Sequence, residues 1–217
     1  GLTGYAMASS DNVRRALEIA VQYNELTTDR YGLELGIDDG KAYITYVDAG
    51  SPAAQVNISR GMQLVSVDGV TLANIATDSQ YETVIDGLFP PLGESHRFVF
   101  SSPIGSNRTV TLTSKSVAVS PVYTSKTLNT SFGAVGYLAF NTFNSTIAAG
   151  QLKNAFETFN NNGISDLVVD LRYNGGGYLY LSSILAYLTA GNNVAESDDF
   201  ATIKYNDKRS DDDYTFA

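Results

Sequence analysis

Short apolar or alternating segments, separated by Gly, Asp and Pro, fill the first half of the chain. This pattern is typical of β-strands joined by tight turns. It predicts strands over residues 31–37, 42–47, 63–67, 97–100 and 109–113. Asp38-Asp39-Gly40 has the composition of a hairpin turn between the first two strands. Apolar residues at three- and four-residue steps predict two helices, over residues 11–26 and 78–88.

The pattern changes in the second half of the chain. Strand-like residues 135–143 and 167–171 alternate with helical spacing over residues 147–160 and 178–190. This order, with a continuously apolar second strand, indicates a parallel sheet covered by helices. The stretch before it, from about residue 115 to 132, is rich in Ser, Thr and Val and has no clear period. It is typical of a linker that can include an edge strand, and we expect the domain boundary there.

These patterns predict an α+β protein in four parts. They are an N-terminal helical segment (1–29), a small β domain (30–116), a linker (117–132) and the start of an α/β domain (133–217). No apolar run is long enough to span a bilayer, so we expect no membrane span in this chain.

Composition narrows the chemistry by exclusion. The net charge of −9 and the scattered basic residues argue against nucleic-acid binding. Cysteine is absent, which excludes disulfides, thiolate nucleophiles and cysteine-based metal sites. His96 is the single histidine and lies in a predicted strand, where a surface or structural role is expected. We therefore expect neither a metal nor a cofactor.

One informative constellation runs from Ala49 to Gly69. It reads as a tight turn, a one-turn helix with Pro52 at its start, a glycine turn, a buried strand and an Asp-Gly turn. Its order and spacing resemble a PDZ domain of the bacterial protease-associated type, with Met62 where that family usually has an acidic residue.

The PDZ resemblance implies a binding segment as well as a fold. In PDZ domains a glycine-containing loop offers backbone N–H groups to a peptide's C-terminal carboxylate, and the peptide then adds as a strand. The matching segment here follows Tyr31 and comprises Gly32, Leu33, Glu34 and Leu35. The alternative is that this segment is only a core strand.

The second constellation is the octapeptide Asp170–Gly177, which follows the apolar strand and opens into a helix. Its three glycines allow a sharp turn that presents N–H groups in the positive potential of a helix N-terminus. Such a loop can bind phosphate or form an oxyanion hole. No Lys-Ser/Thr pair follows the glycines, and their spacing is not that of a dinucleotide fold. A purely structural turn is the remaining alternative.

Asp-Leu-Arg-x-Asn-x-Gly-Gly after an apolar strand resembles the signature of S41 peptidases, the tail-specific and carboxyl-terminal-processing serine proteases. Val135–Phe140 resembles the strand that opens their catalytic domain, and the PDZ-like module lies before it, as in that family. The resemblance covers roughly residues 28–205. It implies a catalytic domain of the ClpP/crotonase-like ββα type.

The family's glycine pair contributes backbone N–H groups to the oxyanion hole. This implies that role for Gly176 and Gly177, with Gly176 as first choice and Gly175 as a close neighbour. The polar residues of the signature are expected to hold the shape of the loop; they are Asp170, Arg172 and Asn174.

The family's serine nucleophile and lysine base are not recognisable in this chain. The serines beyond the glycines lack the small neighbours of a nucleophile turn; they are Ser182, Ser183, Ser197 and Ser210. Lys204 and Lys208 have no partner serine, and the acidic residues Asp207 and Asp211–Asp213 read as a solvated loop. We therefore expect an inactive fragment of a serine peptidase that cleaves proteins near or from their C-termini.

The resemblance also implies partners and a location. Protein or peptide C-termini are the expected substrates, a homo-oligomer is compatible with the sequence, and the cell envelope or periplasm of a bacterium is the expected compartment. Two alternatives stay open: a non-catalytic S41-like protein that binds peptides or small ligands, and a crotonase-like acyl-transfer or hydratase enzyme. The PDZ-like module argues against the second.

Overall fold

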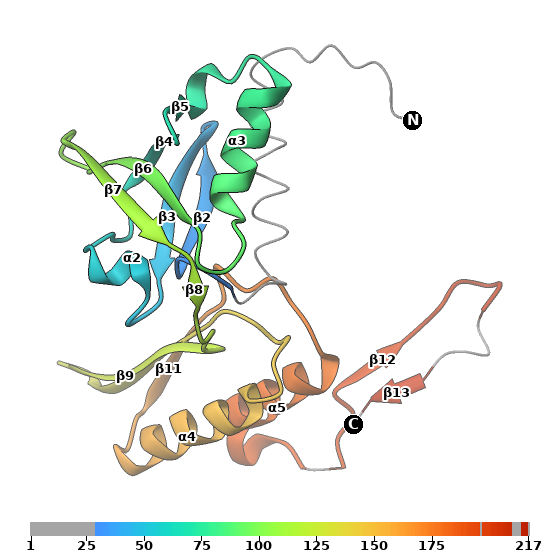
Figure 1. Cartoon of the computed structure of the whole chain (residues 1–217). Coiled ribbons are helices and arrows are strands. Elements are labelled where there is room, and N and C mark those ends of the chain that lie inside the picture. Colours follow the sequence, from blue (N-terminus) through green and yellow to red (C-terminus); the bar gives the residue numbers. More distant parts are fainter. Residues whose placement is uncertain (1–28, 196, 210–213, 217) are drawn as a thin grey trace. The chain divides into compact units, whose positions relative to one another are not determined.

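A computed structural model describes residues 29–195, 197–209 and 214–216 (Figure 1). The chain divides into two compact units, with the boundary between Val119 and Ser120. The helix predicted over residues 11–26 lies outside the described residues. The mixture of helices and strands confirms the α+β class.

The first unit is built on a six-stranded antiparallel sheet. Its strand order is β2 (Leu33–Asp38), β3 (Lys41–Val47), β4 (Gln63–Val67), β6 (Ser95–Ser101) and β7 (Asn107–Thr113), with β5 (Val70–Thr71) paired to β4. The helical elements are α2 (Pro52–Gln55), the 3-10 turn η1 (Leu72–Asn74) and α3 (Asp78–Leu88). A separate pair joins β1 (Asp29–Arg30) to β8 (Lys115–Ser116).

Two Asp-Gly turns set the register of this sheet. Asp39 and Gly40 both have positive φ (46° and 70°), as a type I′ hairpin turn requires, and they place Asp38 opposite Lys41. Asp68 and Gly69 also have positive φ (47° and 84°) and form the corresponding turn between β4 and β5. The predicted hairpin between the first two strands and the predicted Asp-Gly turn after the third are therefore confirmed, and the predicted helix over residues 78–88 coincides with α3.

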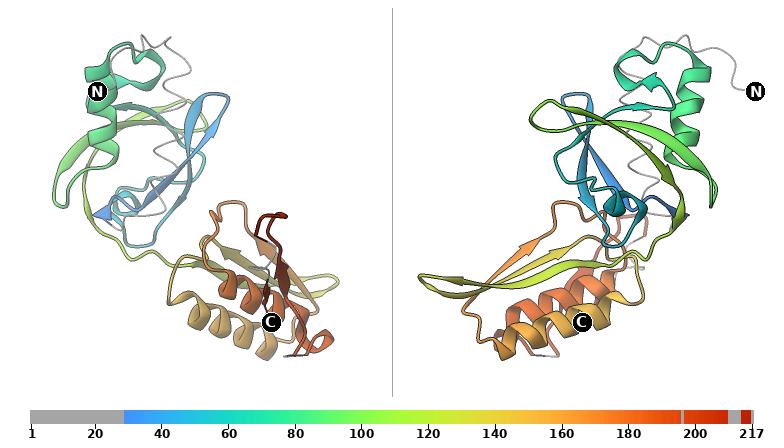
Figure 2. Two further views of the ribbon diagram at one scale, coloured as in Figure 1. Left: turned by 90° about the vertical axis from the view of Figure 1, so that its right-hand side faces the viewer. Right: turned by 60° about the vertical axis from the view of Figure 1, so that its left-hand side comes forward.

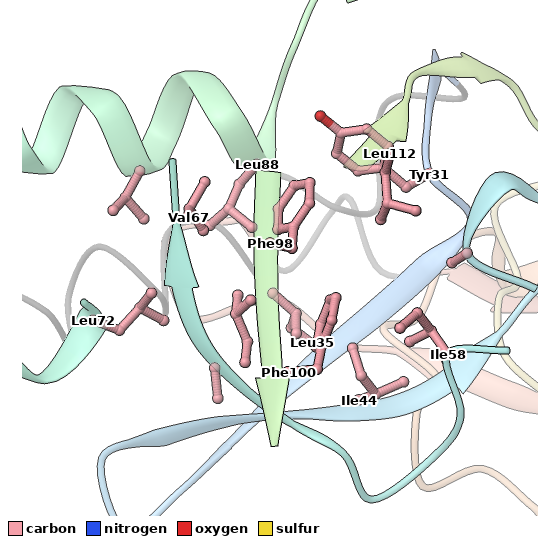
Figure 3. Close-up of a cluster of buried hydrophobic side chains, with 14 of the residues drawn as sticks. Tyr31, Leu35, Ile44, Ile58, Val67, Leu72, Leu88, Phe98, Phe100 and Leu112 are labelled. Carbon is pink, nitrogen blue, oxygen red and sulfur yellow. The ribbon is translucent and has the colours of Figure 1, made fainter. Parts of the chain in front are cut away.

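The core of the first unit lies between the sheet and the helical elements (Figure 3). Phe98 and Phe100 from β6 are fully buried at its centre, and the Tyr31 ring meets Phe98 edge-on at a centroid distance of 5.0 Å. The other large members come from both the strands and the helical elements; they include Leu35, Ile44, Val67, Leu72, Leu88 and Leu112.

The second unit has a three-stranded sheet in the order β11-β10-β9. The central strand β10 (Gly133–Phe140) runs antiparallel to β9 (Val122–Thr130) and parallel to β11 (Asp166–Asp170). Helices α4 (Ala148–Asn161) and α5 (Leu179–Ala190) lie side by side on one face of this sheet (Figure 2). The parallel pairing predicted for the second half of the chain is confirmed.

Two short elements complete the second unit. The 3-10 turn η2 (Gly191–Asn193) follows α5. Strands β12 (Ala201–Ile203) and β13 (Tyr214–Phe216) pair antiparallel. None of the helices in the described part of the chain has the length and apolar character of a membrane span.

The structure refines two sequence predictions for this half. The expected linker, residues 117–132, contains the edge strand β9, which pairs along β10 after a turn that ends at Gly133 (φ 121°). The predicted strand 167–171 was expected to lie in a parallel sheet covered by helices. Only Leu167 and Val169 pack into the core, whereas Val168 is 48% exposed. Among the described residues, β11 is thus an edge strand covered on one face.

Candidate functional site

The first candidate site lies where β2 begins, at the edge of the six-stranded sheet that the described residues form. Gly32 immediately precedes this strand and has a φ of 68°. A Cβ at this position would lie 2.1 Å from the Ser51 Cβ, so a side chain cannot be accommodated. Glycine is therefore required both by the backbone conformation and by the close contact with Ser51.

The carbonyl groups of Tyr31 and Gly32 accept hydrogen bonds from residues 48–53. The Ala53 N–H donates to the Tyr31 carbonyl (3.0 Å). The Gly32 carbonyl accepts from the Asp48 N–H (2.8 Å) and from the Ser51 hydroxyl (3.2 Å). In a trans peptide the C=O and the following N–H point in opposite directions. The N–H groups of Gly32 and Leu33 consequently point away from residues 48–53.

A small apolar hollow lies beside this segment. It is lined by Arg30, Tyr31, Leu33 and Leu35 from the β2 side and by Leu88 and Phe89 from the C-terminal end of α3. Arg30 is only 8% exposed, and its guanidinium lies 4.8 Å from the centroid of the Phe89 ring. Burial lowers the pKa of Arg30 from its usual value, yet an arginine keeps its charge at neutral pH. The wall of the hollow thus carries a positive charge.

The structure places three of the four predicted binding residues together at this site. Leu33 and Leu35 line the hollow, and Gly32 shapes the segment, whereas Glu34 does not line it. Sequence reasoning missed Arg30, Leu88 and Phe89. The helix over residues 78–88 was predicted, but no local pattern indicates that its C-terminal end lies beside β2.

The second candidate site is the glycine loop between β11 and α5. Gly177 has a φ of 137°, and a Cβ there would lie 2.2 Å from the Phe143 carbonyl carbon and 2.4 Å from the Asn144 nitrogen. This absence of a side chain lets the loop pair with the segment that follows β10. The Phe143 N–H donates to the Gly176 carbonyl (2.8 Å), and the Tyr178 N–H donates to the Phe143 carbonyl (3.0 Å).

The Asn174 side chain determines which glycine N–H is available. Its Nδ2 donates to the Phe140 carbonyl (2.9 Å), and its Oδ1 accepts from the Gly176 N–H (2.8 Å). Gly176 was the first choice as an oxyanion donor, but its N–H is engaged inside the loop. The structure gives the Gly177 N–H no hydrogen-bond partner among the described residues, so Gly177 replaces Gly176 as the candidate donor.

Asp170 and Arg172 brace the start of the same loop. Asp170 accepts from the Tyr137 hydroxyl (2.6 Å) and from the Arg172 backbone N–H (3.1 Å), and it pairs with the Arg172 guanidinium (2.6 Å). The hydrogen bond from Arg172 holds the pKa of the Asp170 carboxyl well below its usual range. These contacts, together with those of Asn174, fit the expectation that the polar signature residues shape the loop.

The remaining candidates do not gather at either site. His96 Nδ1 lies 2.6 Å from Asp68 Oδ2 on the first unit, which fits the expected structural role. Ser183 donates to the Tyr180 carbonyl within α5. Within residues 29–195, 197–209 and 214–216, no cluster of His, Asp and Glu could hold a metal ion.

Comparisons with known proteins match each half of the chain to a family. Residues 134–216 match the model of peptidase family S41, and residues 20–85 match that of the PDZ domain. A chloroplastic C-terminal processing peptidase of Tetradesmus obliquus is 30% identical over 170 residues, which are 67% of this chain and 33% of that protein. The chain thus spans about a third of the length of this curated relative.

Two solved structures share the fold. One, described as an S41 protease of Bacteroides fragilis, has a TM-score of 0.61 at 22% sequence identity. The match covers 99% of this chain and 60% of that protein's chain. A photosystem II D1 C-terminal processing protease has a TM-score of 0.51 at 23% identity and covers 77% of this chain and 47% of its own. The chain therefore belongs to peptidase family S41, with a PDZ domain ahead of its S41 region.

Proposed function

We propose that the chain comes from a serine peptidase that cleaves proteins near their C-termini, and that its PDZ unit binds the substrate's C-terminal tail. The observation that carries this proposal is the orientation of the Gly32 and Leu33 N–H groups. They point away from residues 48–53 and lie beside an apolar hollow, at the edge of the sheet that the described strands form.

Each part of the first site has a counterpart in a peptide tail. A terminal carboxylate accepts from the two N–H groups, and the Arg30 charge in the wall of the hollow favours the anion. The last side chain enters the hollow against Leu33, Leu35 and Leu88. The tail then extends along β2, the edge strand among the described residues, where backbone hydrogen bonds hold it as an added strand.

The second site supplies one donor for acyl-transfer chemistry. The Gly177 N–H lies just before α5, where the helix dipole favours a developing negative charge. One preorganised oxyanion donor stabilises a transition state by about 3 kcal/mol. Because Asn174 engages the neighbouring N–H and fixes the loop, the Gly177 donor needs little reorganisation.

The 217-residue chain by itself is proposed to be inactive. The serines of α5 lie on the apolar-striped helix, and in the described part of the chain no lysine pairs with a serine near Gly177. This inactivity also fits the alternative of a non-catalytic S41-like protein that binds peptides. The peptidase reading is preferred because the S41 signature retains a donor suited to an oxyanion.

Binding of labelled peptides tests tail capture. A fluorescein-labelled Gly/Ser-rich peptide that ends in Ala, Val or Leu is titrated with the purified chain, once with a free C-terminus and once amidated. Fluorescence polarisation is expected to give about tenfold tighter binding of the free acid, the order of a charged hydrogen bond. Equal binding of acid and amide would contradict tail capture.

Proteolysis tests the other half of the proposal. The chain is incubated with an unfolded protein and the products are followed by mass spectrometry, with and without a serine-reactive inhibitor. No cleavage is expected. Inhibitor-sensitive cleavage would show that the chain carries its own nucleophile and would overturn the proposed inactivity.

A further inference from the structure

We infer that Ser51 is a positioning residue for tail binding: its hydroxyl holds the Gly32 carbonyl so that the Leu33 N–H faces the peptide carboxylate. This inference rests on the proposed capture of C-terminal tails. Neither the PDZ match nor the S41 match assigns a role to this serine.

The Ser51 side chain is enclosed and makes two hydrogen bonds. It is 2% exposed. Its hydroxyl donates to the Gly32 carbonyl (3.2 Å) and accepts from the Ala54 N–H (3.2 Å). A hydroxyl is the smallest side chain that can do both, since it has one O–H donor and two lone pairs. An alanine at this position can do neither.

These two bonds connect the start of α2 to the binding segment. Ser51 is the N-cap of α2, and the Ala53 N–H from the same turn donates to the Tyr31 carbonyl. The turn therefore holds two successive carbonyls of the binding segment, those of Tyr31 and Gly32. Peptide planarity passes this orientation to the N–H groups of Gly32 and Leu33.

The Gly32 carbonyl also accepts from the Asp48 N–H (2.8 Å), so this backbone bond survives loss of the hydroxyl. Ser51→Ala is therefore expected to fold and to keep β2 in place. What it loses is the second donor, so the Gly32–Leu33 peptide plane is held by one hydrogen bond instead of two and is less restricted in rotation. The expected defect is specific to the carboxylate and does not extend to the apolar hollow.

The ratio of amide to acid dissociation constants measures that defect. The same labelled peptides, free and amidated, are titrated with wild type and with Ser51→Ala. Wild type is expected to prefer the acid about tenfold, and the variant less than about threefold, because one charge-assisted contact is misaligned. A variant that keeps the wild-type ratio would overturn the role of Ser51.

A matched control separates positioning from stability. Thr77 is the N-cap of α3, and its hydroxyl accepts from the Gln80 N–H (3.3 Å) at the end of that helix opposite the hollow. Thr77→Ala loses a cap of the same kind and is expected to keep the wild-type ratio. An equal fall in the ratio in both variants would mean that the effect is global, which contradicts positioning.

A second variant covers failure of Ser51→Ala to fold, as judged by far-UV circular dichroism. Ser51→Thr retains the hydroxyl and is expected to keep at least about half of the wild-type ratio, because threonine caps helices nearly as well as serine. Collapse of the ratio in a folded Ser51→Thr would contradict the inference. If wild type itself shows no preference for the acid, the proposed tail capture is wrong, which is distinct from failure of the Ser51 role.

Discussion

Tyr31 links the core of the first unit to the tail-binding segment. Its ring is 2% exposed and packs edge-on against Phe98, while its backbone carbonyl accepts from the Ala53 N–H. Its hydroxyl donates to the Gly87 carbonyl on α3 (3.0 Å). The Tyr31 side chain thus links the start of β2 to the C-terminal end of α3, and the hollow lies between these two elements.

Removal of the Tyr31 hydroxyl tests the strength of this tie. Tyr31→Phe keeps the ring but loses the buried donor to the Gly87 carbonyl, so the free energy of unfolding is expected to fall by about 1 kcal/mol. Urea denaturation measures the change. Tyr43→Phe is the control, because the hydroxyl of Tyr43 on β3 has no hydrogen-bond partner within the described ranges. Equal effects of the two changes would contradict the assignment.

The same phenol predicts a pH effect. Burial raises the pKa of Tyr31 above its ordinary value of 10.0. An acid whose pKa is higher in the folded state favours unfolding once the unfolded form ionises, so wild type loses stability as the pH rises above about 10. Tyr31→Phe lacks this group and is expected to lose less over that range. Parallel stability curves of the two proteins above pH 10 would contradict it.

The loop between β11 and α5 depends on the absence of a side chain at Gly177. Gly177→Ala would force a Cβ against the backbone of Phe143 at a φ of 137°, and a destabilisation of about 2 kcal/mol is expected. Gly150→Ala is a control in the same unit. Gly150 lies in α4 with open space around its Cβ position, and there alanine is expected to stabilise by up to about 1 kcal/mol. Thermal unfolding compares the two.

The elements that could be predicted from sequence are those with local signals. The Asp-Gly turns at Gly40 and Gly69 need two successive positive φ values, which few residue pairs adopt. The helix α3 begins where the Thr77 side chain caps it. Such signals lie within a few residues of the structure that they determine, so the hairpins and this helix agreed with the prediction.

Strand β9 gave only a weak signal, an edge strand within a linker, because it lacks a hydrophobic face. Most of its residues are exposed or half-buried on both sides of the sheet, so no alternation appears in the sequence. Its pairing comes from the turn at Gly133 and from the neighbouring strand β10. For β11 the sequence indicated more burial than the structure shows. A continuous apolar run suggests burial on both faces, whether or not another element covers each face.

The two candidate sites could likewise be predicted from the sequence only in part. The glycine-rich loops were found because glycine is needed at Gly32 and Gly177, and that need is written in the sequence. Which N–H is available depends on the Asn174 side chain, which reaches both the Phe140 carbonyl and the Gly176 N–H. The contribution of Arg30 and Phe89 depends on packing between distant elements. Neither arrangement leaves a local pattern.

The two units each have their own core, and the proposed roles separate in the same way. One cluster of buried side chains belongs to the PDZ unit and the other to the S41 unit. Tail binding is proposed for the first and oxyanion stabilisation for the second. A binding assay with the chain therefore reports on the first unit without requiring catalysis.

The net charge of −9 acts on every tail that approaches this molecule. A negative field attracts cations and repels anions before any contact forms, and about 0.15 M salt screens it over roughly 8 Å. Tails with lysines upstream of the last residues are therefore expected to associate faster than tails with glutamates, even though both carry the same terminal carboxylate.

Stopped-flow polarisation measures this effect with two labelled peptides that share their last four residues and differ in three upstream charges. At about 20 mM salt the basic peptide is expected to associate about tenfold faster, and at about 500 mM salt the two rates converge. The dissociation rates are expected to stay similar, because the shared last residues make the close contacts. A rate ratio that does not change with salt would mean that upstream contacts, and not the field of the whole molecule, distinguish the tails.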